Sequence, residues 1–80
     1  MILKFYAVKD ELSNTFLAPV LMNSEAEAQR QFKTQINTIP IWKENSEDFS
    51  LYELGEFNDE TGELIGHIEK LTGGRSVKNA

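Results

Sequence analysis

The sequence has no cysteine and a single histidine, and it has no long apolar run. Without cysteine, disulfides and thiolate-bound metals are excluded, which fits a reducing compartment. No segment approaches the roughly 20 apolar residues that cross a bilayer. The N-terminal residues 1–9 lack the long apolar core and the small-residue cleavage site of a signal peptide. We therefore expect a soluble, cytoplasmic protein with no membrane contact.

The chain is short, with 80 residues of which 40% are hydrophobic. This size predicts one small domain with a limited buried core. We place the domain at residues 1–70. Residues 71–80 contain Gly73, Gly74 and few apolar side chains, which predicts a flexible basic tail.

The net charge of −5 is unevenly distributed. Residues 1–68 hold five basic and twelve acidic groups, whereas residues 69–80 hold three basic groups and one acidic group. Non-specific DNA affinity comes mainly from phosphate neutralisation by Lys and Arg. The acidic body therefore argues against broad DNA coating and leaves room for a local basic site or a protein partner.

The first half of the chain predicts two strands and a helix. Residues 2–8 are apolar in both alternating registers, which is typical of a strand covered on both faces. Residues 15–22 form a second strand, at an edge or bulged because Pro19 cannot donate to a ladder. A helix follows over residues 25–37. Ser24 and Glu27 form its capping box, and a stripe faces the core at Ala28, Phe32 and Ile36.

The second half predicts a hairpin. Pro40 ends the helix, and residues 42–48 read as a polar loop. Strands at residues 49–57 and 63–68 flank an acidic turn, in which Asp59 accepts backbone N–H groups and Gly62 takes a positive φ. Alternation places Phe49, Leu51 and Phe57 on one face of the first strand, and Tyr52 with Leu54 on the other.

These elements predict an α+β fold with the order β-β-α-β-β, in which one helix packs on a four-stranded, antiparallel-rich sheet. One helix covers only one sheet face, so apolar side chains on the other face would form an interaction surface. We expect a homodimer that uses this face. Its interface residues would be Ile2, Tyr6, Val8, Tyr52 and Leu54.

Neither catalysis nor a cofactor is indicated. His67 is near Glu63 and Glu69 in the sequence, but no nucleophile–base pair accompanies it. The acidic residues of the turn do not follow the spacing of an EF-hand, and Gly73–Gly74 does not form a phosphate loop. We expect no enzyme activity, no metal and no cofactor.

The sequence also permits a local site for nucleic acid. The candidate phosphate contacts are Arg30, Lys33, Lys70, Arg75 and Lys78. Tyr6, Trp42 and Tyr52 could stack on unpaired bases. The alternative is equally consistent with the sequence: the aromatics pack in the fold, and Arg30 and Lys33 form a solvated helix face.

The order of short motifs along the chain carries a family resemblance. The pattern Asp-Phe-x-Leu-Tyr-x-Leu-Gly-x-Phe-x-Asp-x-Thr-Gly spans residues 48–62. Upstream are Lys4-Phe-Tyr-Ala-Val-Lys-Asp10, then Phe16, Pro19 and Asn23, then Ala28, Arg30 and Phe32. In this order the motifs resemble the small nonstructural protein of gokushovirus-type microviruses, which are single-stranded DNA phages. Residues 39–42 and those after Ile68 lie outside the resemblance.

The resemblance implies a setting in the host cytoplasm. It implies a nonstructural accessory protein in single-stranded DNA genome synthesis or packaging. Such a protein would act as a dimer on DNA, on phage or host replication or packaging proteins, or on both. The alternative is a protein-interaction module that engages a host or phage protein through its acidic hairpin, without contacting DNA.

Overall fold

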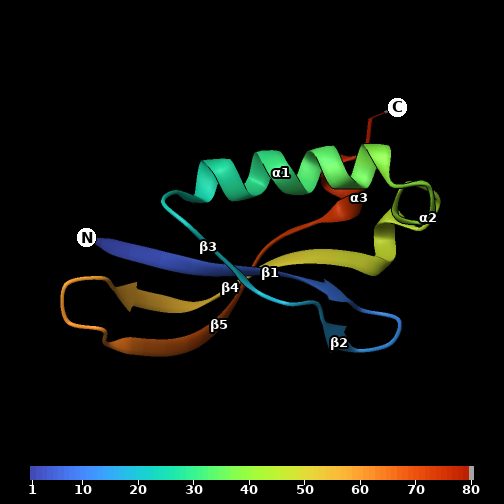
Figure 1. The fold of residues 1–80 in the computed structure, drawn as a ribbon. Helices are drawn as coiled ribbons and strands as arrows, with labels where there is room; N and C mark the ends of the chain where they lie inside the picture. The colour runs from blue at the N-terminus through green and yellow to red at the C-terminus, as the bar shows by residue number, and fades with distance from the viewer. Residues whose placement is uncertain (80) are drawn as a thin grey trace.

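A computed structural model describes residues 1–79 as one antiparallel sheet with its helices on one face (Figure 1). The strands are β1 (Ile2–Asp10), β2 (Thr15–Phe16), β3 (Val20–Met22), β4 (Phe49–Asn58) and β5 (Leu64–Gly73). The helices are α1 (Glu25–Thr38), α2 (Pro40–Glu44) and α3 (Gly74–Val77), with a 3-10 turn, η1, at Ser46–Asp48.

The sheet has the strand order β2-β1-β4-β5, and β3 also pairs with β1. All of these pairings are antiparallel, so the expected α+β fold is confirmed. The strand expected over residues 15–22 is divided into β2 and β3 by Leu17–Pro19, which gives five strands instead of four. The interruption includes Pro19, which has no backbone N–H to donate to β1.

Helix α1 begins and packs as its sequence predicts. The Oγ of Ser24 accepts a hydrogen bond from the backbone N–H of Glu27 at 3.2 Å. Ala28, Phe32 and Ile36 are at most 2% exposed. They form the core together with Tyr6, Val8, Phe49 and Leu51 of the sheet.

Residues 42–48 are not a loop. Pro40 is the first residue of α2, where its missing N–H costs nothing. The Trp42 ring stacks on Phe49 with 4.8 Å between ring centroids. This tertiary contact holds a helix of five residues, which is too short to show a periodic pattern in the sequence.

The expected flexible tail after residue 70 is also wrong. Residues 71–73 continue β5, and α3 then packs against the core through Val77. Gly74 is buried so tightly that a Cβ there would lie 2.3 Å from the carbonyl oxygen of Ser46. The side-chain amide of Asn37 in α1 donates to the carbonyl of Val77 at 3.1 Å. The packed unit therefore extends beyond residue 70, and Ala80 lies outside the described residues.

The sheet face opposite the helices differs from the expected one in three residues. Tyr6 and Val8 lie in the core beneath α1, and alternation places Ile2 on the same side of β1. The sequence could not decide this because both faces of β1 are apolar. Tyr52 and Leu54, in contrast, lie on the face away from α1, as expected from their alternation with the buried Leu51.

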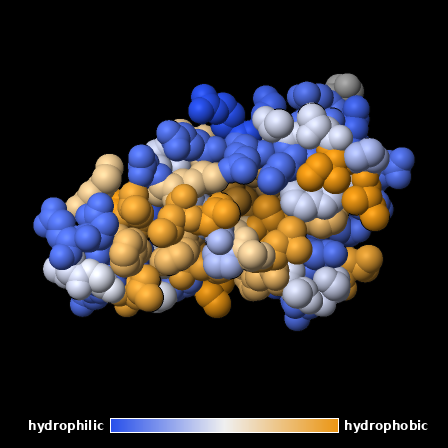
Figure 2. Space-filling model, in the orientation of Figure 1, coloured by the Kyte–Doolittle hydropathy of each residue, from blue (hydrophilic) through white to orange (hydrophobic). Residues whose placement is uncertain are grey.

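We call this uncovered surface the open face. Alternation and strand pairing give its members. They are Leu3, Phe5, Ala7, Lys9, Phe16, Leu21, Ser50, Tyr52, Leu54, Phe57, Leu64, Gly66, Ile68 and Lys70, of which Ala7 and Ser50 are themselves buried. Figure 2 shows one side of the molecule, on which apolar side chains gather over the sheet and polar ones over α1.

Phe57 joins the open face because β4 is irregular. The pairing of β1 with β4 shifts between Phe5 and Tyr6, so that Phe57 is paired with Leu3. Gly55 at this point has φ 151°, and a Cβ would lie 2.3 Å from the carbonyl oxygen of Ile65. Only glycine fits this approach of β5. The expected grouping of Phe57 with Phe49 and Leu51 is therefore wrong.

Candidate functional surfaces

A buried carboxylate links three strands on the helix side of the sheet. Glu53 of β4 is 4% exposed. One of its oxygens lies 3.3 Å from the Nζ of Lys4 in β1, and the other contacts the Nε2 of His67 in β5. Glu69 is paired with Glu53 across the strands. His67 therefore meets Glu53, a partner that its sequence neighbourhood did not indicate.

Glu53, His67 and Glu69 each offer a ligand atom within 4.8 Å of the others, a spacing that could hold a metal ion. However, the Lys4 ammonium already neutralises Glu53, and this hydrogen bond raises the pKa of Lys4. In residues 1–79 no buried side-chain nitrogen or oxygen lacks a hydrogen-bond partner. The Lys4–Glu53 ion pair and the contact of Glu53 with His67 therefore tie β1, β4 and β5 together.

A second polar cluster lies at one end of the open face, around Glu11. The Tyr52 hydroxyl donates to Glu11 at 3.1 Å, and the ammonium groups of Lys9 and Lys70 lie 3.3 and 3.9 Å from its oxygens. Lys9 also lies over the rings of Phe16 and Tyr52, which meet edge to face. Lys70 is thus on the open face, away from the other candidate DNA contacts.

The electrostatics of this cluster follow from its hydrogen bonds. Burial alone would raise the pKa of Glu11, but hydrogen bonds from Ser50, Tyr52 and Lys9 lower it below the ordinary value. Burial, followed by the hydrogen bond to Glu11, raises the pKa of Tyr52. Tyr52 and Glu11 are therefore held as a neutral phenol and a carboxylate at neutral pH.

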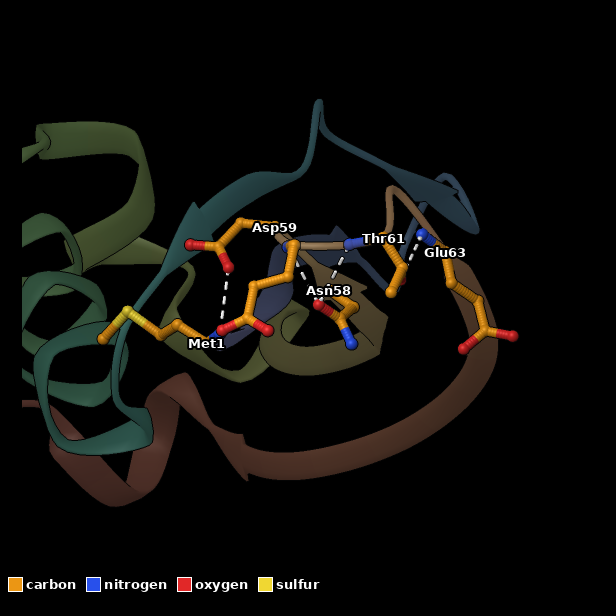
Figure 3. Close-up of polar contacts among 6 residues, drawn as sticks. Met1, Asn58, Asp59, Thr61 and Glu63 are labelled. Carbon is orange, nitrogen blue, oxygen red and sulfur yellow. Dashed lines mark hydrogen bonds and ion pairs between the residues drawn. The ribbon is translucent and has the colours of Figure 1, made fainter.

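The acidic turn between β4 and β5 is held by Asn58 rather than by Asp59 (Figure 3). The Oδ1 of Asn58 accepts the N–H groups of Glu60 and Thr61 at 2.9 and 3.4 Å. Asp59 instead accepts from the Met1 ammonium at 2.9 Å, and this bond raises the pKa of that amino group. Gly62 has φ 77°, as expected. The predicted role of Asp59 in the turn is therefore wrong.

Four of the candidate DNA contacts lie on the helix layer. Arg30 and Lys33 are exposed on α1, and Arg75 and Lys78 are exposed in and just after α3. Asn37 joins the two helices through Val77 and through the backbone N–H of Asn79. We call the four side chains the basic helix surface.

Ion pairing separates this surface from the sheet. Within residues 1–79 none of its four cations has a carboxylate within 4.0 Å, whereas Lys4, Lys9 and Lys70 each have one. Of the three aromatics considered for stacking on bases, Tyr6 is in the core, Trp42 is stacked on Phe49, and Tyr52 packs against Phe16. The sequence did not show this division, because Lys4 and Lys70 pair with carboxylates that are distant in the sequence and Lys9 pairs with a residue of the following turn.

No helix in residues 1–79 is both long enough and apolar enough to cross a membrane. None of the curated proteins and none of the solved structures compared with the chain matches it. One family model matches, that of the Phage ORF5 protein, over residues 3–77. This range includes residues 39–42 and the stretch after Ile68, which the sequence motifs left outside the resemblance. Since the match spans β1 to α3, the chain belongs to the Phage ORF5 protein family.

Proposed function

We propose that this phage protein is a nonenzymatic accessory factor in genome synthesis or packaging of a gokushovirus-type microvirus. It acts in the host cytoplasm and contacts single-stranded DNA through the basic helix surface. The phage family supports the general setting. The motifs of residues 48–62 support the microvirus assignment.

The observation that carries the DNA contact is the absence of ion pairs on the basic helix surface. Phosphate binding gains free energy when a cation exchanges its counterions for the backbone. A cation that already faces a carboxylate must give up that contact first. Arg30, Lys33, Arg75 and Lys78 have no such contact within residues 1–79, whereas Lys70 faces Glu11 on the open face. The proposal therefore omits Lys70.

The charge of the hairpin restricts DNA to the helix layer. The β4 and β5 strands and their turn carry the acidic groups Glu53, Glu56, Asp59, Glu60, Glu63 and Glu69 against one lysine, Lys70. Phosphates are repelled from this hairpin. The basic helix surface is therefore where a strand of DNA can approach.

Fluorescence anisotropy with a labelled oligothymidine across a salt series tests the proposal. Each phosphate contact to a single strand contributes about 0.7 to the slope of log K against log salt. The double variants Arg30→Gln/Lys33→Gln and Arg75→Gln/Lys78→Gln should each lower the slope by about 1.4. Lys70→Gln is the matched control and should leave it unchanged. Absence of binding by the full chain at about 50 mM salt would exclude direct DNA contact.

That outcome would favour the alternative, a protein-interaction module that uses the acidic turn. Its supporting observation is that Glu60 and Glu63 are exposed on a turn fixed by Asn58 and by the Met1–Asp59 ion pair. In this case, pull-down from infected cells should recover a phage or host protein, and Glu60→Gln/Glu63→Gln should lose it.

A further inference from the structure

We propose that the open face is the interface of a two-fold symmetric homodimer in which the two sheets pack with their strands antiparallel. The Lys9 and Lys70 end of each open face then lies against the acidic turn of the other copy. This inference does not depend on DNA binding.

The open face is apolar, and its most exposed side chains lie on the edge strands β3 and β5. Ile68 is 73% exposed, Leu64 is 65% exposed and Leu21 is 43% exposed. A shallow groove crosses this surface, lined in part by Phe16, Pro19, Leu54 and Ile68. Residues 12–24, which form β2, β3 and their flanks, contain no charged side chain. A contiguous apolar surface of this kind on a water-soluble fold marks a site of association.

Charges at the two ends of the open face identify the partner. At one end, Lys9 and Lys70 outnumber Glu11. At the other, Asp59, Glu60 and Glu63 outnumber the Met1 ammonium. Strands β1 and β4 run from one end to the other, since Asp10 is paired with Phe49 and Ile2 with Asn58.

A two-fold axis that lies between the two sheets and perpendicular to their strands brings unlike ends together. The face is thus complementary in charge to a second copy of itself, which is the requirement for an isologous interface. Single-stranded DNA fits the open face poorly, because the apolar side chains of this face offer no cation to phosphate. An anionic membrane would repel the acidic turn.

The molecule is also large enough to form a stable dimer interface through its sheet. Its extents are 43 × 23 × 16 Å. The broad side is comparable in area to the roughly 800 Å² that each partner contributes to a stable interface of standard size. Because β1, β4 and β5 all contribute side chains, the contact would cover most of the sheet.

Light scattering after size exclusion at micromolar concentration should report about twice the chain mass of 9.1 kDa. Ile68→Asp places a charge among the exposed apolar side chains of the open face and should give a monomer with an unchanged circular dichroism spectrum. Ile41→Asp is the matched control. Ile41 is 63% exposed but lies in α2 on the helix layer, so this variant should remain dimeric. A monomeric parent chain, or a dimeric Ile68→Asp chain, would overturn the proposal.

Charge reversal tests the antiparallel arrangement separately. Lys70→Glu or Glu63→Lys alone should weaken the dimer by about tenfold or more, because like charges then meet across the interface. The chain that carries both changes should recover most of the parent affinity. If both single variants weaken the dimer and the double variant weakens it further, the antiparallel orientation is wrong.

Discussion

Glu11 receives contacts from three strands: the ammonium groups of Lys9 in β1 and Lys70 in β5, and the hydroxyl of Tyr52 in β4. It lies in the turn after β1, where no local pattern indicates a distinct role. Its contacts fix the Lys9 and Lys70 end of the open face. They also hold the edge-to-face pair of Phe16 and Tyr52 in place.

The lowered pKa of Glu11 predicts a pH-dependent contribution to stability. A carboxylate with a lower pKa in the folded state stabilises the fold above its unfolded pKa of about 4.3. This contribution is lost as pH falls through the folded value. In urea unfolding, Glu11→Gln should therefore be less stable than the parent at pH 7, and the difference should shrink at pH 3.

Glu44→Gln is the control, because Glu44 is exposed and has no ion pair within residues 1–79. Its stability difference from the parent should stay small at both pH values. If the stability difference between Glu11→Gln and the parent is the same at pH 7 and pH 3, packing and not charge explains the effect.

At the scale of elements, α1 is anchored mainly by Phe32. Phe32 is 1% exposed and lies at the centre of the stripe formed with Ala28 and Ile36. Loss of a buried Phe costs about 3–5 kcal/mol, whereas small domains have about 5–15 kcal/mol in total. Phe32→Ala should therefore melt far below the parent in a circular dichroism scan and be largely unfolded at 37 °C.

Thr34→Ala provides the comparison within the same helix, since Thr34 is exposed. It should melt within a few degrees of the parent. If Phe32→Ala did the same, the packing of α1 on β1 and β4 would not be a main source of stability.

The elements that were predictable are those with local signals. Ser24 and the Ala28–Phe32–Ile36 stripe lie within one helix, so the sequence predicts both its start and its buried side. The face of β1 was not predictable, because both alternating registers of the strand are mostly apolar and only the position of α1 decides between them. The shift at Gly55 depends on the approach of β5, a contact that no local pattern encodes.

The candidate sites likewise divide into those with a local sequence signal and those formed by tertiary contacts. Exposure of Arg30 and Lys33 follows from the helical pattern. The Glu53 and Glu11 clusters were missed because they join residues distant in sequence, such as Glu11 and Tyr52. The register of β1, β4 and β5, which brings these residues together, is fixed by tertiary pairing.

Across the whole molecule, three surfaces of different character are separated. The basic helix surface lies on one side of the sheet, the open face on the other, and the acidic turn at one end (Figure 1). The two proposed contacts therefore do not compete. A dimer formed through the open faces would carry a basic helix surface on each of its outer sides, available to DNA.

The C-terminal residues therefore contribute to the packing of the fold as well as to the charge of the basic helix surface. Truncation after Leu71 removes Val77, which packs on the core, and the hydrogen bonds that Asn37 makes to residues 77 and 79. Loss of the partly buried Val77 contact together with the two hydrogen bonds of Asn37 costs about 1.5 kcal/mol or more. For a domain of this size, each kcal/mol lowers Tm by about 4–8 °C.

We therefore expect the truncated chain to melt about 6–12 °C or more below the parent. Arg75→Gln/Lys78→Gln removes the same two cations and leaves the backbone in place, so it should melt within a few degrees of the parent. Differential scanning calorimetry of the three chains separates the two effects. Equal Tm values for the truncated and full-length chains would contradict the packing of α3, and truncation would then be a test of charge alone.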